Sequence, residues 1–448
     1  MIFNLGDILN KLQVSLEHDN LDEAIALIES LRSPDQAEVF SELDEHNQKA
    51  LLPRLDPSNS ADILEELDEQ NAAKLVANMP TAAVARIVDQ MEPDEAADLL
   101  GDMPPHRAQA VLEKLEDPEE VRPLLIHPDD SAGGLMTSEF LALRPRTAVR
   151  EALDALRQWK PNAETFYYLF VVDQSKKLCG VVGLRQLIVS PLDTPIRDLM
   201  DPQVISVKAG TDQEECARVL SRYDLLALPV VDNNNVLLGV ITIDDVVDVL
   251  EDEATEDIQR MGGAQPLDTP YLETGVFQIA KKRVGWLMLL FVTEMLTGTV
   301  LRHFQDELQV VVALSFFVPL LIGTGGNAGS QTTSTIIRAL AVGDVELKDA
   351  LHALWHELRT GLLLGLAMSI IAFIRALTWG SATPLAETVA LAIFVIVIWA
   401  NVLGAVLPLL AAKVGIDPPI VSGPVMSTLV DATGLFIYFT IAKILLGL

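Results

Sequence analysis

The 448-residue sequence predicts a multidomain chain with an N-terminal α-solenoid, α/β domains in tandem, and a C-terminal five-helix transmembrane α bundle. Three observations predict this order. Apolar residues recur every twelve positions over about the first 125 residues, a strand–helix–strand pattern then occurs twice, and five apolar segments follow residue 276. Residues 276–448 carry equal numbers of acidic and basic residues, so the net charge of −31 lies on the first 275.

The twelve-residue repeat predicts a stack of short helices. A large apolar residue begins each repeat, from Leu31 to Leu115, and prolines such as Pro57 and Pro93 follow several of them. Twelve residues do not make a whole number of helical turns, so one continuous helix could not keep this face buried. Short helices joined by turns can bury it on their neighbours, which predicts an acidic α-solenoid over residues 1–128.

Residues 129–192 and 193–250 each run through a short strand, a helix, a strand ending in Val-Val-Asp, a turn, another strand and a helix. This order and spacing resemble a tandem pair of cystathionine-β-synthase (CBS) domains, which usually act as regulatory modules. Thr242 and Asp245 in the second copy resemble the Thr-x-x-Asp signature that holds a nucleotide ribose, so ATP or another adenine nucleotide is a candidate ligand. The first copy has Gly183-Leu184-Arg185-Gln186 there, so at most one good nucleotide site is expected.

A strongly acidic helix is predicted from Ile243 to about Met261, where Gly262-Gly263 ends it, and residues 251–275 form the linking segment. Its acids share helix faces at i,i+3 and i,i+4 spacing in two groups: Asp245, Asp248 and Asp252, then Glu253, Glu256 and Asp257. Like charges so placed repel, and a divalent cation would relieve that repulsion. A solvated face is the simpler explanation of a charge run, but its place just before the membrane favours a cation site.

Residues 276–448 contain five apolar segments, which predict the transmembrane domain: 284–301, 310–325, 362–377, 389–410 and 420–446. The second and third are short for a crossing of about 30 Å, so their helices must extend into the polar flanks. With the amino-terminal domains inside, seven basic residues lie at inner ends and three at outer ends, as the positive-inside rule requires. The soluble domains are therefore expected in the cytoplasm.

Asp431 lies near the middle of the last apolar segment, where insertion of a charge costs about 2.5–3.5 kcal/mol. Small residues such as Gly423, Ser427 and Gly434 surround it and let helices approach closely or leave room for water. A carboxylate in that setting indicates a cation site, whereas a structural ion pair or a protonated aspartate would be the simpler alternatives.

The second apolar segment ends in a stretch, residues 323–340, that is rich in glycine, asparagine, serine and threonine. Such residues are tolerated at membrane depth when they face protein or water. The stretch around Asn327 lacks the lysine of a phosphate loop, so close helix packing beside a pore is the better explanation.

Enzymatic chemistry and nucleic-acid binding are both disfavoured. The sequence shows no nucleophile–base pair, zinc-type Cys/His cluster or phosphate loop, so no enzyme is expected. The acidic soluble half disfavours nucleic acid and favours metal cations or basic partners.

The domain order, together with GTGGNAGSQ (323–331) and VSGPVMSTLVDATGLFIY (421–438), closely resembles the MgtE-type magnesium channel/transporter family over essentially the whole chain. The resemblance implies a homodimer in the lipid bilayer of a bacterial inner membrane, with the pore lined by the second and fifth segments. Asp431 then matches the pore carboxylate, and Ser427 matches a position whose carbonyl faces the ion. Gly423 and Asn327 complete the implied pore residues.

The resemblance also implies regulatory Mg²⁺ ligands, at Asp94, Asp98, Glu214, Asp224, Asp245, Asp248, Glu253, Glu256, Asp257 and Asp417. Gln309 stands where an acid is often found in the family, and Glu294 has no recognised counterpart. The expected function is Mg²⁺ uptake through a pore that closes when cytoplasmic Mg²⁺ binds the acidic N and CBS domains. The alternatives are a Co²⁺ or broad divalent-cation carrier and a membrane-anchored, nucleotide-sensing CBS protein.

Overall fold

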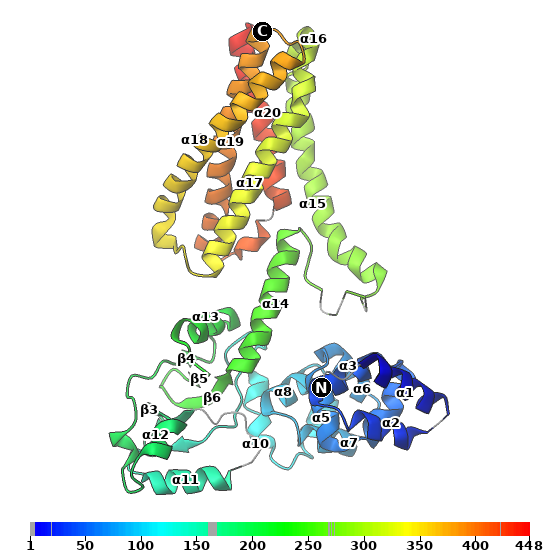
Figure 1. Cartoon of the computed structure of the whole chain (residues 1–448), viewed down its shortest axis with the longest axis vertical. Helices are drawn as coiled ribbons and strands as arrows, with labels where there is room; N and C mark the ends of the chain where they lie inside the picture. The colour runs from blue at the N-terminus through cyan, green and yellow to red at the C-terminus, as the bar shows by residue number, and fades with distance from the viewer. Residues whose placement is uncertain are drawn as a thin grey trace. The chain divides into compact units, whose positions relative to one another are not determined.

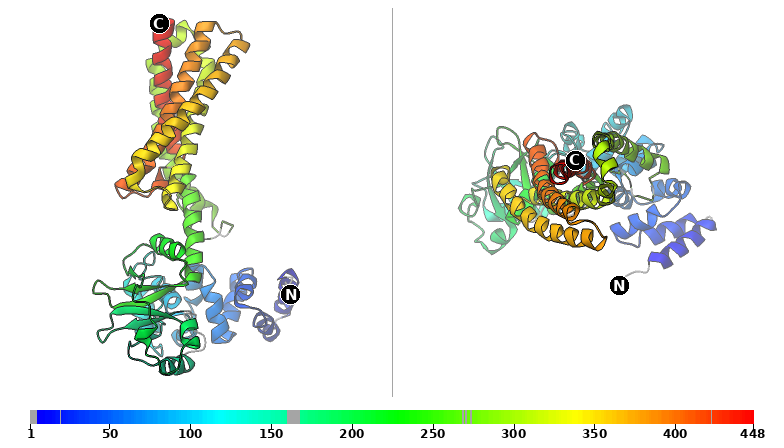
Figure 2. Two further views of the ribbon diagram at one scale, coloured as in Figure 1. Left: turned by 60° about the vertical axis from the view of Figure 1, so that its left-hand side comes forward. Right: turned by 90° about the horizontal axis from the view of Figure 1, so that it is seen from above.

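The computed structural model describes residues 5–18, 20–159, 168–267, 269, 271–272, 274–421 and 423–448, apart from the side chain of Glu69. It divides the chain into two compact units, Met1–Glu251 and Asp252–Leu448. Figures 1 and 2 show the ribbon of both units.

The first unit begins with short helices that stack in two rows, which confirms the predicted solenoid (Figure 1). One row is α3, α5, α7 and α9, and the other is α4, α6, α8 and α10, because each helix packs on the one after next. The helices are α1 (Leu5–Glu17), α2 (Leu21–Ile28), α3 (Ser33–Ser41), α4 (Glu45–Leu51), α5 (Pro57–Glu65), α6 (Glu69–Val76), α7 (Thr81–Val88), α8 (Pro93–Gly101), α9 (Pro105–Leu112) and α10 (Pro118–Val121), with 3₁₀ turns η1 (Leu52–Arg54) and η2 (Leu124–Ile126).

Local sequence explains why these helices are short. Aspartates cap several of them, as Asp44 does when its side chain accepts a hydrogen bond from the Asn47 N–H. Prolines such as Pro57 and Pro93 occupy the first helical turn, where their missing N–H is not needed. Most of the repeated apolar residues are buried, including Leu31 and Met91. Each unit of the repeat therefore ends at a turn and buries its apolar face on its neighbours.

Two three-stranded sheets follow, and they have the same topology. The first contains β1 (Ala142–Leu143), β2 (Tyr168–Val172) and β3 (Leu178–Gly183), with helices α11 (Val149–Gln158) and α12 (Leu184–Val189) and the turn η3 (Ile196–Asp198). The second contains β4 (Val207–Lys208), β5 (Ala227–Val231) and β6 (Leu237–Thr242), with α13 (Gln213–Tyr223) and α14 (Ile243–Met261). In each sheet the first pairing is parallel and the second is antiparallel.

The two α/β copies exchange backbone pairing. Thr137, ahead of β1 in the first copy, bridges Val240 in β6, and Asp201, ahead of β4 in the second copy, bridges Val181 in β3. One continuous apolar core then joins the solenoid to the second copy and includes Val246 and Val249 of α14. The start of α14 is therefore held within the first unit.

The second unit contains the five helices of the described chain that are long and apolar enough to cross a membrane. They are α15 (Val276–His303), α17 (Val318–Ala341), α18 (Ala350–Thr378), α19 (Thr383–Lys413) and α20 (Gly423–Leu446), with α16 (Gln305–Val310), η4 (Val312–Phe317), η5 (Leu347–Asp349) and η6 (Pro418–Ile420) between them. Helices α17, α18, α19 and α20 form a bundle, whereas α15 packs on α20 (Figure 1). As predicted, the second and third spans extend well beyond their apolar segments.

Glycines let α17 lie very close to its neighbours. A Cβ atom at Gly325 would lie 2.7 Å from a methyl carbon of Ile396 and 2.8 Å from one of Val430. At Gly404 it would lie 2.6 Å from the carbonyl oxygen of Gly329. The glycine-rich stretch therefore serves helix packing, as its sequence predicted.

Candidate ion path and acidic sites

A stripe of polar groups runs between α17 and α20. The Ser330 hydroxyl donates to the carbonyl oxygen of Gly423 at 3.3 Å and lies 3.4 Å from the Ser427 hydroxyl. A Cβ atom at Gly326 would lie 3.3 Å from the Ser427 Oγ atom and 3.7 Å from Asp431 Oδ1. We call Gly326, Ser330, Gly423, Ser427 and Asp431 the polar stripe.

The charge of the polar stripe lies on Asp431 alone. Its side chain is partly exposed, while Oδ1 is shielded and accepts no hydrogen bond from the described residues. Asp431 Oδ1 and the Ser427 hydroxyl therefore both lie against Gly326, and no basic side chain among the described residues donates to this oxygen. Asn327, which was predicted to belong to the pore, is exposed on α17.

Behind the stripe, buried polar side chains fasten α17 to α18 and α19. The Thr332 hydroxyl lies 2.7 Å from Asn401 Oδ1 and 3.2 Å from Glu357 Oε2. Asn401 is 1% exposed, and its amide donates to the Val397 carbonyl at 2.8 Å. Glu357 was missed by the sequence analysis, because it lies in the polar flank before the third apolar segment.

A second group of carboxylates lies in the first unit, where the solenoid meets the start of α14. Asp94 is 5% exposed, and its Oδ1 atom has no hydrogen-bond partner among the described residues. The backbone N–H of Glu92 donates to Glu65 Oε1 at 2.9 Å. We call Glu65, Glu92, Asp94, Glu95 and Asp245 the acidic cluster. Its members Asp94 and Asp245 were predicted, and Glu65, Glu92 and Glu95 were missed.

Burial and mutual repulsion make this cluster hold protons strongly. Burial, with repulsion from Asp245 and Glu65, raises the pKa of Glu92 to about 7. Burial, with repulsion from Asp98, raises the pKa of Glu95 to about 9. The pKa of Asp94 is raised well above its ordinary value for the same reasons. A cation arriving here would replace these protons and neutralise the repulsion.

The chemistry of the acidic cluster suits a divalent cation, because carboxylate oxygens are hard ligands. Asp94 Oδ1 is buried, and no donor from the described part of the chain reaches it. Within the described ranges, however, no three His, Cys, Asp or Glu side chains are arranged as ligands of one metal ion. The regulatory ligand set therefore stays a prediction.

Thr242 and Asp245, the predicted nucleotide ligands, contact each other. The Thr242 hydroxyl donates to Asp245 Oδ2 at 2.5 Å, and the Thr242 N–H donates to the same oxygen at 3.2 Å. In the first copy the Gly183 N–H donates to Gln186 Oε1 at 3.0 Å, so the two signatures occupy matching places at a helix start. Asp245 thus belongs to both the predicted nucleotide site and the acidic cluster.

Other predicted regulatory residues are spread over both units. In the first unit, Glu214 pairs with Arg218 at 3.4 Å, and Asp224 ends α13 in the left-handed conformation with φ of 51°. Asp98 lies near Glu95, and Asp248 is exposed on α14. Burial, and then repulsion from Asp248, raises the pKa of Glu66. In the second unit, Glu253 and Asp257 lie on α14.

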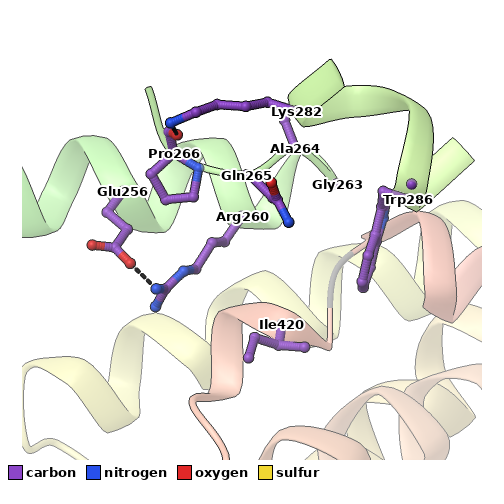
Figure 3. A pocket seen from close by; sticks show the side chains of 10 residues that line it. Glu256, Arg260, Gly263, Ala264, Gln265, Pro266, Lys282, Trp286 and Ile420 are labelled. Atoms are coloured by element: carbon purple, nitrogen blue, oxygen red, sulfur yellow. Dashed lines mark hydrogen bonds and ion pairs between the residues drawn. The ribbon is translucent and has the colours of Figure 1, made fainter. Parts of the chain in front are cut away.

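Glu256 and Asp417 are brought together by a residue that the sequence analysis overlooked. Arg260 forms ion pairs with both carboxylates. Glu256 and Arg260 border a cavity of about 690 Å³, which Lys282 and Trp286 also line (Figure 3). The i,i+4 spacing of Glu256 and Arg260 was the signal that could have found the first pair.

The fold and these sites define a multi-pass membrane protein with soluble helical and CBS domains. Residues 318–441 match the family MgtE, described as a divalent cation transporter, residues 10–82 and 31–130 match the MgtE intracellular N domain, and residues 132–192 and 196–252 match the CBS domain. The magnesium transporter MgtE of Thermus thermophilus is 45% identical over 327 residues, 73% of this chain and 72% of that protein. The Bacillus subtilis magnesium transporter MgtE is 37% identical over 322 residues, 72% of this chain and 71% of that protein.

The chain belongs to the MgtE family, whose members are transporters and not enzymes. Its fold also resembles a crystal structure of the soluble part of a magnesium transporter, with 35% identity and a TM-score of 0.51 over 56% of this chain and all of that one. A crystal structure of the cytosolic domain of the Mg²⁺ channel MgtE in complex with ATP gives 35% identity and a TM-score of 0.51, over 54% of this chain and 99% of that one.

Proposed function

We propose that this protein conducts Mg²⁺ through the membrane as a homodimer, with Asp431 facing the ion path. The polar stripe between α17 and α20 carries this proposal, because it places hydroxyl and carbonyl oxygens in a row beside a carboxylate within the apolar bundle. Membership of a family of magnesium transporters supports the identity of the ion.

The chemistry of the stripe suits a hydrated divalent ion. Mg²⁺ gives up its water reluctantly and prefers six oxygen ligands in octahedral geometry. Hydroxyl groups such as those of Ser330 and Ser427 can hydrogen-bond the waters of the ion without replacing them. The Asp431 carboxylate attracts the cation within the membrane, where an uncompensated charge is costly.

A homodimer would double that attraction. One chain contributes a single carboxylate to the stripe, and Asp431 remains partly exposed. A second copy placed with its own stripe opposite would give two carboxylates, which balance one Mg²⁺. Self-complementary two-fold contacts of this kind are the commonest form of oligomer.

Closure by cytoplasmic Mg²⁺ is the second half of the proposal. In the absence of a cation, burial and then mutual repulsion disfavour charge on the acidic cluster, and both raise the pKa values of Glu92 and Glu95. Mg²⁺ would favour the arrangement that brings these carboxylates together and so shift the population toward a closed state. The predicted ligands on α14 and Asp417 would pass this change to the membrane helices.

An adenine nucleotide is a further proposed ligand. Thr242 and Asp245 would hold its ribose, and the ATP complex of a related cytosolic domain supports ATP as a ligand of the soluble part. Because Asp245 also belongs to the acidic cluster, nucleotide and metal would act on the same carboxylate.

Flux of Mg²⁺ into liposomes containing the purified protein tests the transport proposal. Asp431→Asn should lower the flux at least about tenfold, a loss of about 1.4 kcal/mol, because the ion path loses its charge. Asp306→Asn, a change at an exposed acid between the spans, is the matched control and should leave flux near wild type. Equal flux in the wild type and Asp431→Asn would refute the placement of the ion path.

The same assay separates the alternatives. Absence of flux at every internal Mg²⁺ concentration would favour the nucleotide sensor, and Co²⁺ flux above Mg²⁺ flux would favour the broad divalent-cation carrier. For closure, neutralising Glu253, Glu256 and Asp257 together should keep the path open at high internal Mg²⁺. Unchanged inhibition would contradict the proposed role of α14.

A further inference from the structure

Arg260 joins two carboxylates that are far apart in the sequence. It lies in the last turn of α14, where one guanidinium nitrogen pairs with Glu256 one turn earlier, and the other pairs with Asp417. Figure 3 shows the pair with Glu256 beside the cavity. Asp417 directly precedes η6, which leads into the ion-path helix α20. Arg260 thus connects the end of α14 to the entrance of the helix that carries Asp431.

The guanidinium group supplies what a bound cation would supply. It carries one fixed positive charge and presents N–H donors to both carboxylates, and it has no acceptor or lone pair to offer a metal. A divalent cation held between Glu256 and Asp417 would take the place that the guanidinium group now occupies. Two positive charges at that place would repel each other, so binding of the ion and pairing with Arg260 oppose each other.

We propose that Arg260 is a tethered counter-cation that occupies Glu256 and Asp417, and that a divalent cation must displace it to bind them. This inference rests on the proposed closure by Mg²⁺. It adds that Arg260 determines how much cytoplasmic Mg²⁺ is needed to close the path. The displaced side chain has room to move, because the cavity of about 690 Å³ lies directly beside it.

Exposure limits the size of the effect. The side chains of Arg260, Glu256 and Asp417 are 34%, 29% and 36% exposed, so water and salt screen both pairs. Ion pairs with this exposure contribute only modestly to free energy. Removal of the Arg260 charge should therefore change the apparent affinity for Mg²⁺ by about three- to tenfold.

The first test is the internal Mg²⁺ concentration that halves flux in liposomes. Arg260→Gln should lower that concentration about three- to tenfold, since the carboxylates become free for the ion. Arg260→Met removes the same charge and should act alike, and Arg260→Lys keeps the charge and should stay within about twofold of wild type. In an Asp417→Asn background, Arg260→Gln should have less effect, because one of the contested ligands is gone. An unchanged or raised half-closing concentration in Arg260→Gln would overturn the proposal.

The second test follows Arg260 itself and does not depend on transport. Phenylglyoxal modifies free guanidinium groups, and peptide mass spectrometry of the full chain gives the rate at Arg260. Added Mg²⁺ should raise this rate several-fold, whereas the exposed Arg54 in the solenoid serves as reference and should not change. Asp417→Asn should raise the rate at Arg260 without Mg²⁺. A rate at Arg260 that Mg²⁺ leaves unchanged or lowers would refute displacement.

These outcomes separate this inference from the proposed function. Wild-type protein without Mg²⁺ flux would refute transport, while phenylglyoxal labelling would still report whether Mg²⁺ displaces Arg260. Wild-type protein with normal flux and closure, but with Arg260→Gln closing at the wild-type concentration, would refute the role of Arg260 alone.

Discussion

Gly326 on α17 and Asp431 on α20 face each other so closely that a methyl group at Gly326 would lie 3.7 Å from the carboxylate oxygen Oδ1. The same methyl carbon would lie 3.3 Å from the Ser427 hydroxyl. The neighbouring Gly325 instead faces apolar side chains, because a Cβ there would collide with Ile396 and Val430. Gly325 thus lets α17 pack closely on its neighbours, and Gly326 lies directly against the hydroxyl and carboxylate of the polar stripe.

Gly326→Ala should therefore lower Mg²⁺ flux at least about threefold, since the added methyl crowds the polar stripe and removes room for the waters of the ion. The matched control is Gly323→Ala, where an added Cβ meets no atom within 4 Å. Its flux should stay within about twofold of wild type, because alanine also suits the helix. Flux in liposomes measures both variants, and an unaffected Gly326→Ala would mean that the ion passes elsewhere.

Glu294→Gln tests a variant of the divalent-cation carrier in which Glu294 couples transport to protons. Glu294 lies exposed on α15 and is not part of the polar stripe between α17 and α20. Its neutral isostere should therefore leave Mg²⁺ uptake and the pH dependence of uptake within about twofold of wild type. Uptake is measured at several external pH values, beside Asp431→Asn as the inactive reference. Loss of both uptake and its pH dependence would instead favour coupling through Glu294.

The sequence could predict features that depend on local pattern. The twelve-residue repeat, the duplicated strand–helix order and the apolar segments each follow from periodicity, and the fold confirms them. Asp431 stood out because a charge within an apolar segment is costly. The sequence also indicated that a stretch of small and polar residues in the second span lies beside the pore. Which residues of that stretch lie nearest Asp431, namely Gly326 and Ser330, follows only from the contacts between α17 and α20.

For each residue missed at the sequence level, the local sequence already offers a simple reason for its presence that does not involve a site. Glu95 lies in the first turn of α8, where an acid is expected to favour the helix dipole, and only stacking of the solenoid brings it near Asp245. Glu357 lies in a polar flank, and only the bundle places it against Thr332. Arg260 belongs to an acidic run, and its partner Asp417 comes from a distant segment. Contacts of this kind depend on packing over long sequence separations.

Thr332→Val should loosen the attachment of α17 to α18 and α19. Valine has a similar shape but cannot donate to Asn401 Oδ1 or Glu357 Oε2, and a buried acceptor left without a donor costs about 1–3 kcal/mol. The expected result is a lower unfolding temperature of the detergent-purified protein and faster hydrogen exchange in α17. Thr335→Val is the control, because Thr335 is exposed and its hydroxyl donates to the Gln331 carbonyl of its own helix. Equal stability of the two variants would contradict the proposed fastening.

The acidic cluster should make the first unit sensitive to pH in a predictable direction. The pKa values of Glu92 and Glu95 are raised from 4.5 to about 7 and about 9, mainly by burial. Between these values and the unfolded pKa, the folded chain holds protons that the unfolded chain has released. Without Mg²⁺, the contribution of Glu92 and Glu95 to the stability of the first unit is therefore greatest below about pH 4.5. That contribution falls as the pH rises through about 7 for Glu92 and about 9 for Glu95.

Hydrogen exchange of α8 in the full chain, measured from pH 6 to 9 after correction for intrinsic exchange, should show this loss of protection. Mg²⁺ competes with the protons, so the concentration that restores protection should fall as pH rises. Glu95→Gln should increase protection at pH 8 by about 1–3 kcal/mol and weaken the pH dependence, because the amide carries no charge. Exposed Glu113→Gln is the control and should change neither. Protection that increases with pH in the absence of Mg²⁺ would contradict the raised pKa values and, with them, the proposed role of this cluster in closure.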